Sequence, residues 1–459
     1  MSLLLDSALA NNNLKYIDAT GEHNDILLEE IITENTTILD QSEKSLTFLY
    51  VDNSINSISI FWLFMQSKHC IALLSDSMAP KFKIALEKKY KPKYIFDKER
   101  NDISGYKNRK IGPYDIKELK NPINYLIDEK IKILLSTSGT TGSPKFVKLS
   151  EKNLIENTSS ICNYLPINKQ DVTPLNLPIN YSYGLSVLLT NSLKGGNIIC
   201  SVPDILQREF WDALENYGFT SIAGVPFVYE MLDRFGFTKK FYKSLKYLSQ
   251  AGGKLKDELV EKFGHYALEN NMQFFVMYGA TEASARMSYL EPHKVLTKKG
   301  SIGKPIKNGA FALDKDTSEL IYDGPNVFGG YANNLQDLSH YDESNILRTG
   351  DIARKDSDGY YYIVGRIKRF VKISGLRINL DEVEGLIFSM KQVPVKCIGY
   401  NDEQLVVFLE KNDLDIKKLK KQVSSELKIH NSFIRFNEIS KFPLTSNGKI
   451  DYKKLETYL

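Results

Sequence analysis

The sequence has few of the residues that mark secreted, metal-binding or membrane proteins. Its 459 residues include four cysteines and six histidines, and the formal net charge is only +4. The cysteines lie far apart with no C-x-x-C pair, which predicts free, buried thiols in a reducing compartment. The nearly balanced charge disfavours a nucleic-acid partner. The scattered histidines show no H-E-x-x-H spacing, so no metal site of that kind is predicted.

Long apolar runs are also missing. The longest one, residues 58–65, is far too short to cross a bilayer. Residues 1–10 are apolar, but the stretch is short and lacks the basic leader of a signal peptide. We therefore expect a cytoplasmic protein without a membrane span.

Short apolar runs alternate with helix-like segments along most of the chain. This alternation predicts a layered α/β fold, and the length is ample for a large buried core. The expected strands cover residues 46–51, 70–74, 94–96, 131–135, 171–173, 197–201, 219–225, 247–249 and 274–277, and the expected helices 57–66, 81–89 and 183–193.

Past residue 351 the pattern changes to that of a small α+β module. Strands are expected at 360–364, 397–400 and 405–409, and helices at 381–389 and 415–427. A module of about 90 residues is within the usual range of domain sizes. We place the boundary at residues 366–369, which gives a large domain over 1–366 and a small domain over 367–459.

The stretch that follows the expected strand at 131–135 is rich in hydroxyl groups and glycine. Glycines allow a loop to turn its N–H groups inward, hydroxyls add donors, and Lys145 adds a positive charge, so the loop suits a polyphosphate. It is not the Walker loop, because Lys145 lies three residues after the second glycine. Composition alone fits a flexible surface loop equally well. The next helix is expected to begin near Ser150. The loop residues are Thr137, Ser138, Gly139, Thr140, Thr141 and Gly142.

Five segments in order resemble the signatures of the adenylate-forming (AMP-binding) enzymes. This superfamily includes acyl-CoA synthetases, aryl-CoA ligases, luciferase-like proteins and the adenylation domains of peptide synthetases. Residues 136–145 resemble [ST]-S-G-[ST]-T-G-x-P-K. The others are Y-G-A-T-E at 278–282, R-T-G-D at 348–351, G-R-I-K at 365–368 and P-L-T-S-N-G-K-I at 443–450. The resemblance covers about seven tenths of the chain, whereas residues 1–130 are only loosely similar and look shortened.

The resemblance implies both a fold and a reaction. The fold is a large layered α/β domain that binds ATP and the acyl group, with a small mobile C-terminal α+β domain. The reaction joins a small carboxylic acid to ATP, with Mg²⁺, to give an acyl-adenylate and pyrophosphate. The acyl group then passes to a thiol, for which CoA is the leading candidate. A ligase that loads the phosphopantetheine of an acyl carrier protein is the alternative. A non-catalytic nucleotide-binding relative is a third reading, against which the intact motif residues argue. The sequence does not identify the acid.

Motif positions imply the catalytic roles. Lys449 resembles the lysine that bridges the substrate carboxylate and the α-phosphate. Glu282 resembles the carboxylate that holds Mg²⁺, a cation that prefers oxygen ligands. Thr281 is expected to donate to the α-phosphate. Asp351 takes the place of the carboxylate that accepts both ribose hydroxyls, and Arg366 that of the arginine at the ribose or phosphate.

Further positions imply contacts with the nucleotide. Tyr278 is expected to stack on adenine, with Gly279 beside it. The segment Q-A-G-G-K at 250–254 resembles the small-residue run that lines the adenine, where glycine permits close approach of the backbone. Its nucleotide-binding members are Gly252, Gly253 and Lys254.

The acyl pocket departs from the family pattern. The segment P-[LM]-x-H-x-x-G appears as P-I-N-Y-S-Y-G at 178–184, so Tyr181 replaces the histidine. Ser182 stands where peptide-synthetase relatives place an aspartate that holds the α-amino group. A buried ammonium without a counter-charge is costly, so we expect an uncharged acyl or aryl acid rather than an α-amino acid. Tyr181, Ser182, Tyr183, Gly184 and Phe227 are expected to line the pocket.

The second half-reaction implies movement of the small domain. In the family this domain swings, so that Lys449 leaves the site and residues 372–375 enter it. The pivot lies two residues after the arginine of G-R-x-[KD], which makes Lys368 the expected hinge. The basic residues Lys368, Arg369, Lys372 and Arg377 form a cluster that suits a phosphate of CoA or an acidic carrier, or else a solvated face.

Overall fold

The computed structural model describes most of the chain and divides it into two compact units. The described residues are Ala8, 14–19, 26–29, Leu39, 43–136, 145–367, 369–373, 376–401, 403–411, 413–445 and 450–459. Unit 1 comprises Met1–Ala310 and Asp323–Leu347, and unit 2 comprises Phe311–Tyr322 and Arg348–Leu459. The domain boundary expected after residue 366 remains a prediction. Lys368, Lys449 and loop residues 137–144 lie outside the described residues.

Unit 1 contains an eight-stranded sheet with the order β19-β9-β8-β4-β3-β5-β7-β6. Its central strands are parallel and buried, which explains their continuous apolar sequences. Helices α3 (Ile55–Gln66) and α4 (Pro80–Tyr90) connect β3 to β4 and β4 to β5. The strands are β3 (Leu46–Val51), β4 (Cys70–Ser75), β5 (Tyr94–Phe96), β6 (Tyr106–Ile111), β7 (Tyr114–Leu119), β8 (Ile131–Ser136), β9 (Phe146–Ser150) and β19 (Tyr331–Ala332).

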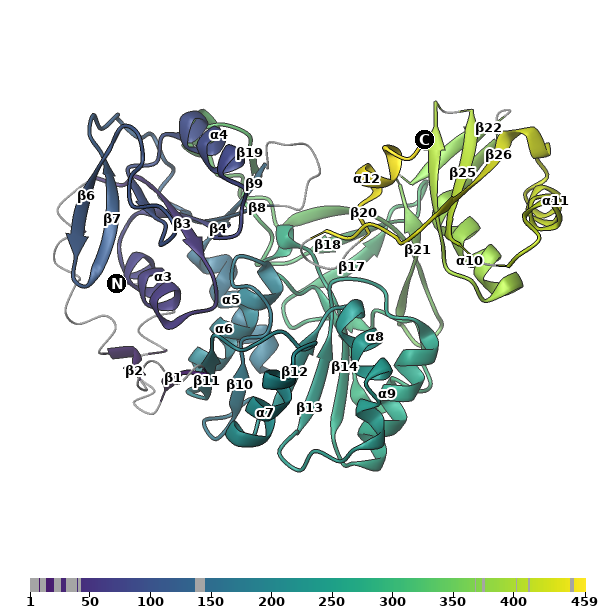
Figure 1. Ribbon diagram of the computed structural model, residues 1–459, viewed down its shortest axis with the longest axis horizontal. Coiled ribbons are helices and arrows are strands. Elements are labelled where there is room, and N and C mark those ends of the chain that lie inside the picture. Colours follow the sequence, from purple (N-terminus) through teal and green to yellow (C-terminus); the bar gives the residue numbers. More distant parts are fainter. Residues whose placement is uncertain are drawn as a thin grey trace. The chain divides into compact units, whose positions relative to one another are not determined.

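A second sheet in unit 1 has the order β12-β13-β14-β15-β16. The first three strands are parallel, and β15 returns antiparallel to β14. In Figure 1, helices α8 and α9 lie along this sheet. Its elements are β12 (Ser221–Gly224), α8 (Pro226–Arg234), η2 (Phe237–Lys239), β13 (Tyr247–Gln250), α9 (Asp257–Glu269), β14 (Gln273–Tyr278), η3 (Thr281–Ala283), β15 (Ser288–Leu290), η4 (Pro292–Lys294) and β16 (Lys304–Pro305).

The third sheet of unit 1 has the order β10-β11-β1-β2. The packed helices α5 and α6 lie close to it in the chain, and α6 contacts β11. Ser150 caps α5, because its side chain accepts from the Asn153 N–H and the Asn153 side chain accepts from the Ser150 N–H. The expected helix start is thus confirmed. The elements are β1 (Lys15–Asp18), β2 (Ile26–Leu27), α5 (Glu151–Cys162), β10 (Val172–Pro174), α6 (Ser182–Lys194), β11 (Asn197–Cys200), α7 (Arg208–Tyr217) and η5 (Gln336–Ser339).

Unit 2 joins a four-stranded sheet, β17-β18-β20-β21, to an α+β layer around β24-β25-β26. Apolar side chains of β22, β25, α10 and α11, among them Val371, Val407, Val383 and Leu419, are fully buried in its core. The elements are β17 (Ala310–Leu313), β18 (Glu319–Asp323), β20 (Ile346–Lys355), β21 (Tyr361–Arg366), β22 (Phe370–Ile373), β23 (Leu376–Asn379), α10 (Leu380–Lys391), β24 (Val395–Tyr400), β25 (Gln404–Glu410), α11 (Ile416–Leu427), η6 (Asn431–Phe433), β26 (Ile434–Ile439) and α12 (Tyr452–Glu456).

The structure confirms the expected α/β class and the free thiols. All four cysteines are unpaired, and Cys70, Cys200 and Cys397 are buried. Burial raises the pKa of the Cys162 thiol to about 12. Within the described residues, none of the helices combines the length and the hydropathy that a bilayer crossing requires.

Candidate functional site

The expected phosphate loop connects two paired strands. Strands β8 and β9 are antiparallel, and Ser136 lies opposite Phe146. The loop residues Thr137, Ser138, Gly139, Thr140, Thr141 and Gly142 lie outside the described part of the chain, but the strands fix its two ends next to each other. Lys145 comes directly before β9 and stands at the end of this hairpin.

Tyr331 connects Lys145 to Glu282. Strand β19 pairs with β9, and Tyr331 lies opposite Val147. The Lys145 ammonium is 3.4 Å from the centroid of the Tyr331 ring, a cation–π contact. The Tyr331 hydroxyl donates a hydrogen bond to Glu282 Oε1 at 2.8 Å. Burial, and then the neighbouring Glu282 charge, raise the pKa of Tyr331. One side chain therefore holds a predicted phosphate ligand and a predicted Mg²⁺ ligand together.

Glu282 and Thr281 lie on η3, in a tight turn that follows β14. Gly279 is required there, because a Cβ atom would lie 1.7 Å from the carbonyl oxygen of Ala285. Ala285 itself has a φ of 119°, a left-handed conformation that costs about 1–3 kcal/mol in a residue with a side chain. Asn326 offsets this strain, since its amide donates to the carbonyls of Ala283 and Arg286 at 2.7 and 2.9 Å. The turn that presents Glu282 is thus fixed by its neighbours.

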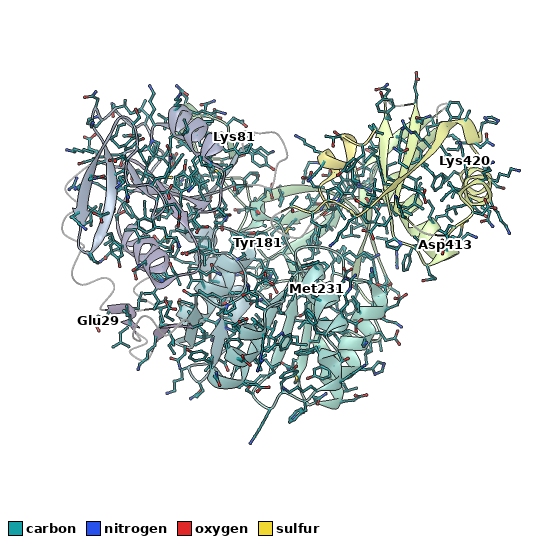
Figure 2. All side chains as sticks on the ribbon, in the orientation of Figure 1. Glu29, Lys81, Tyr181, Met231, Asp413 and Lys420 are labelled. Atoms are coloured by element: carbon teal, nitrogen blue, oxygen red, sulfur yellow. The ribbon has the colours of Figure 1, made fainter. Side chains whose placement is uncertain are left out.

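Two residues of the predicted acyl segment lie against predicted nucleotide residues. The Ser182 hydroxyl, at the start of α6, is 3.2 Å from the Thr281 hydroxyl. The hydroxyl of Tyr181, which Figure 2 labels, would lie 2.6 Å from a Cβ atom at Gly252, whose φ is +86°. The short distance to Tyr181 and the positive φ both require glycine at position 252. Burial raises the pKa of Tyr181 to about 12.

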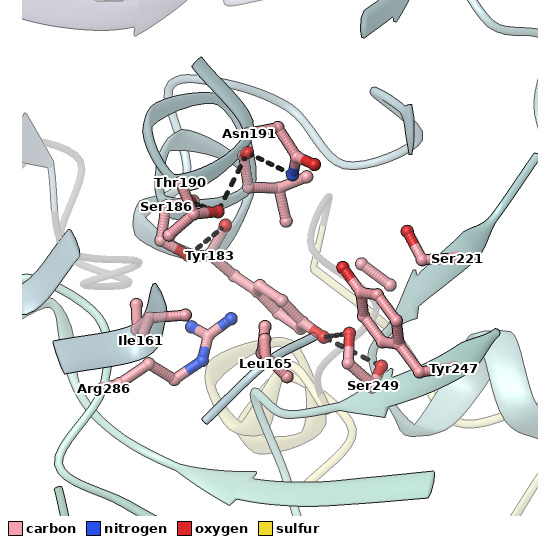
Figure 3. A pocket seen from close by; sticks show the side chains of 12 residues that line it. Ile161, Leu165, Tyr183, Ser186, Thr190, Asn191, Ser221, Tyr247, Ser249 and Arg286 are labelled. Carbon is pink, nitrogen blue, oxygen red and sulfur yellow. Dashed lines mark hydrogen bonds between the residues drawn. The ribbon is translucent and has the colours of Figure 1, made fainter. Parts of the chain in front are cut away.

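Tyr183 points from α6 toward β13. Its hydroxyl donates to the carbonyl of Ser249 at 2.8 Å, and the guanidinium of Arg286 lies 4.0 Å from its ring centroid. Both side chains line a small cavity between α5, α6 and the second sheet (Figure 3).

The remaining predicted residues of unit 1 are less enclosed. Tyr278 ends β14 and is half-buried, Phe227 is half-buried in the first turn of α8, and Lys254 is exposed. A Cβ atom at Gly253 would meet Pro226 at 3.1 Å, so α8 comes close to this segment. Gly184 serves packing, because a Cβ atom there would lie 2.1 Å from the carbonyl oxygen of Pro178.

Asp351 and Arg366 pair within unit 2. They lie opposite each other on β20 and β21, and Arg366 Nε is 2.8 Å from Asp351 Oδ1. The Asp351 side chain is 8% exposed and that of Arg366 is 66% exposed. Gly350 precedes Asp351 with a φ of +73°, and its N–H donates to Glu319 Oε1 at 2.9 Å. The carboxylate is therefore held in place, and the guanidinium is accessible.

Arg369, one of the four basic residues expected to form a cluster near residue 368, is paired with carboxylates instead. The Arg369 side chain is only 15% exposed and forms ion pairs with Asp381 at 2.6 Å and with Glu384 at 2.5 Å. It also stacks on Tyr452 at 4.0 Å. These contacts tie Arg369 into the core of unit 2, so the expectation that it faces a phosphate or a carrier is corrected. Lys368 and the side chains of Lys372 and Arg377 lie outside the described residues.

Comparison with protein-family profiles identifies the family of this chain. A family profile described as "AMP-binding enzyme" matches residues 63–332, more than half of the chain. The chain belongs to this family. The family segment contains Lys145, Tyr181, Thr281, Glu282 and Tyr331, the residues that the structure brings together in unit 1.

Relatives and solved structures agree with this assignment. "Zwittermicin A synthase ZmaJ" of Bacillus cereus is 29% identical over 70% of this chain and 67% of its own length. "Oxalate–CoA ligase" of Arabidopsis thaliana is 30% identical over 57% of this chain and 53% of its own. The O-succinylbenzoate coenzyme A synthetase of Bacillus subtilis, solved with ATP and magnesium ion, has a TM-score of 0.74 and 19% identity over 99% of both chains. The chain thus spans about half to two thirds of the length of these two curated relatives, and shares the fold of the solved synthetase.

Sequence reasoning missed two residues of this region, Arg286 and Tyr331. Arg286 lies four residues after Glu282, but no sequence pattern indicates that it is buried. Tyr331 follows two glycines, but nothing in the sequence indicates that β19 pairs with β9, about 180 residues earlier in the chain.

Proposed function

We propose that the chain activates a small carboxylic acid with ATP to an acyl-adenylate and transfers the acyl group to CoA. Family membership supports AMP-forming chemistry, and the chain of contacts from Lys145 through Tyr331 to Glu282 is the observation that carries the proposal. Tyr331 holds a cation 3.4 Å from its ring centroid and a carboxylate oxygen 2.8 Å from its hydroxyl, and this pair of charges suits a nucleotide phosphate and its metal ion.

The donor set of unit 1 fits Mg²⁺ with ATP. Glu282 is a half-buried carboxylate next to the Thr281 hydroxyl, and both supply the oxygen ligands that Mg²⁺ prefers. When bound, the ion neutralises phosphate charge and draws electrons from the reacting phosphorus. Glu282 would hold the ion, Thr281 would donate to an α-phosphate oxygen, and Lys145 would face the leaving pyrophosphate. The synthetase that shares this fold was solved with ATP and magnesium ion, which supports ATP and Mg²⁺ as the ligands proposed here.

For the motif residues of unit 2 we propose the roles that the family resemblance implies. Asp351 is a fixed carboxylate with two acceptor oxygens, which suits two ribose hydroxyls. Arg366 is two thirds exposed, and its guanidinium suits a phosphate oxygen. Lys449 retains the role that its motif implies, at the developing charge between carboxylate and α-phosphate.

Two assays test the proposal. Acid-dependent exchange of labelled pyrophosphate into ATP, across a panel of short, long-chain and aromatic acids, measures the first step. Mass spectrometry of thioesters formed with CoA, or with a phosphopantetheine carrier protein, then identifies the acceptor. We expect exchange with at least one acid and a CoA thioester. Transfer to the carrier alone would favour the alternative acceptor, and ATP binding without exchange would favour the non-catalytic reading.

A further inference from the structure

Glu319 is a buried carboxylate whose two oxygens contact two residues of the segment R-T-G-D at 348–351. It begins β18, the neighbour of β20 in the sheet (Figure 1), and is 5% exposed. Its Oε1 accepts from the backbone N–H of Gly350 at 2.9 Å, and its Oε2 is 2.5 Å from a guanidinium nitrogen of Arg348. Burial of a carboxylate is costly unless the group is paired and hydrogen-bonded, and Glu319 is both.

The backbone at Gly350 departs from regular strand geometry. Gly350 lies within β20, yet its φ is +73°, whereas the φ of an antiparallel strand is near −140°. The chain therefore bends directly before Asp351. The register of β20 against β21 also shifts, between Ile352 and Ala353. Because the strand is irregular on both sides of Asp351, side-chain partners have to define the direction of the backbone there.

Side-chain hydrogen bonds hold this bend. The Thr349 hydroxyl donates to the carbonyl of Leu320 at 2.7 Å and accepts from the Asp351 N–H at 3.1 Å. The Gly350 N–H, between them, donates to Glu319. The bond to Glu319 is charge-assisted, and such bonds are roughly twice as strong as neutral ones. Its loss should therefore disturb the bend more than the loss of a neutral bond.

Arg348 orients the Glu319 carboxylate. The same guanidinium nitrogen that contacts Glu319 donates to Asp314 Oδ2 at 2.8 Å. The bonds to Asp314 and Glu319 raise the pKa of Arg348. The Arg348 side chain is 54% exposed, so water weakens this pair. The bond from the half-buried Gly350 is screened less.

We propose that Glu319 is a positioning residue for recognition of the ribose. By binding the Gly350 N–H, it sets the bend from which the Asp351 carboxylate reaches the two ribose hydroxyls. The inference rests on the proposed function, in which Asp351 accepts those hydroxyls. Two hydrogen bonds to one carboxylate require a fixed geometry, and a misplacement of about 1 Å can cost on the order of 10²-fold.

Nucleotide binding tests the inference without knowledge of the acid. The full chain is titrated calorimetrically with ATP and with 2′,3′-dideoxy-ATP, both in the presence of Mg²⁺. We expect the unaltered protein to bind ATP about 10-fold more tightly or better, because the analogue lacks both hydroxyl donors. Glu319→Ala should lower this ratio about fivefold or more, while the Kd for dideoxy-ATP changes less than about twofold. A smaller folded fraction weakens the binding of both nucleotides equally, so the ratio measures the ribose contacts.

Two variants separate the Gly350 bond from the charge and from stability. Glu319→Gln keeps the side-chain length and an acceptor oxygen, so it should retain most of the ratio. Glu384→Ala is the matched control. Glu384 is a 12% exposed carboxylate of unit 2 that likewise accepts a backbone N–H, that of Cys397 at 2.8 Å, and pairs with Arg369 at 2.5 Å. Its loss should lower stability but keep the ratio.

The outcomes distinguish the inference from the proposed function. A folded Glu319→Ala that keeps the full ratio refutes the inference and leaves the proposed function standing, as does an equal loss in Glu319→Gln or in Glu384→Ala. If Glu319→Ala does not fold, Glu319→Asp decides by the same criterion, because it withdraws the carboxylate from Gly350 by one methylene. Equal affinity of the unaltered protein for both nucleotides contradicts the ribose role of Asp351 and the inference with it. Absence of nucleotide binding contradicts the proposed function.

Discussion

Replacing Tyr331 with phenylalanine removes one hydroxyl and leaves the ring. The hydroxyl donates to Glu282 at 2.8 Å, and a hydrogen bond to a charged group is worth about 1.5–3 kcal/mol. Tyr331 is 36% exposed, so water competes for the carboxylate, and we discount the value to about 1 kcal/mol. We therefore expect Tyr331→Phe to raise the Mg²⁺ concentration for half-maximal pyrophosphate exchange about fivefold.

The ring itself should matter for ATP rather than for Mg²⁺. Tyr331→Leu removes the face on which Lys145 rests at 3.4 Å, a contact worth about 0.5–1 kcal/mol at an exposed position. We expect this variant to raise the KM for ATP at saturating Mg²⁺ a few-fold, whereas Tyr331→Phe leaves it unchanged. Glu282→Gln removes the carboxylate charge itself, so its increase in the Mg²⁺ concentration for half-maximal exchange should be the largest of the three variants.

A matched control separates this role from general stability. Tyr106→Phe also removes a hydroxyl that donates at 2.8 Å, here to the carbonyl of Pro92. It should leave the Mg²⁺ titration unchanged. The reasoning is refuted if Tyr331→Phe titrates like the unaltered protein, or if Tyr106→Phe shifts the titration equally.

Three further predictions concern the catalytic lysine, the hinge and a buried histidine. Lys449→Ala should lose on the order of 10²–10³ in adenylation rate yet still convert supplied acyl-adenylate to thioester; equal loss of both steps would mean a structural role. Lys368→Pro fixes φ at the expected hinge and should block thioester formation but not adenylation, whereas Lys368→Ala should keep both steps. Single-turnover assays measure each step separately. A normal thioester rate in the proline variant would contradict the hinge. Burial lowers the pKa of His69 from 6.5 to about 4, so the unfolded chain binds the extra proton and stability falls as the pH drops from 6.5 toward 4. The slope is at most about 1.4 kcal/mol per pH unit for this group, and urea unfolding of His69→Gln should show a flatter profile.

Apolar runs bounded by turn residues predicted the central strands of the first sheet closely. β3 and β5 begin and end where the sequence indicates, because parallel strands buried on both faces are continuously apolar. Polar edge strands were missed. The hairpin of β6 and β7 is rich in charged residues and alternates poorly, so no periodicity marks it.

The candidate site could be predicted only where local motifs carry it. The sequence indicates Thr281 and Glu282 from one short segment, and Asp351 and Arg366 from two. Contacts between distant segments have no such signal: Tyr331 reaches Glu282 only because β19 pairs with β9, and Arg286 meets Tyr183 only because α6 packs near β15. For Arg369 the sequence suggested a functional role that the structure does not support, because its charge alone did not reveal its ion pairs with Asp381 and Glu384.

An isotope measurement tests the central claim, AMP-forming activation of a carboxylate, most directly. In this reaction a carboxylate oxygen bonds to the α-phosphorus as pyrophosphate leaves, and the thiol then displaces AMP by attack on the acyl carbon. An acid labelled with ¹⁸O in its carboxylate should therefore yield AMP that contains one ¹⁸O atom, detected by mass spectrometry, together with the thioester. Formation of ADP, or of AMP without the label, would contradict the account.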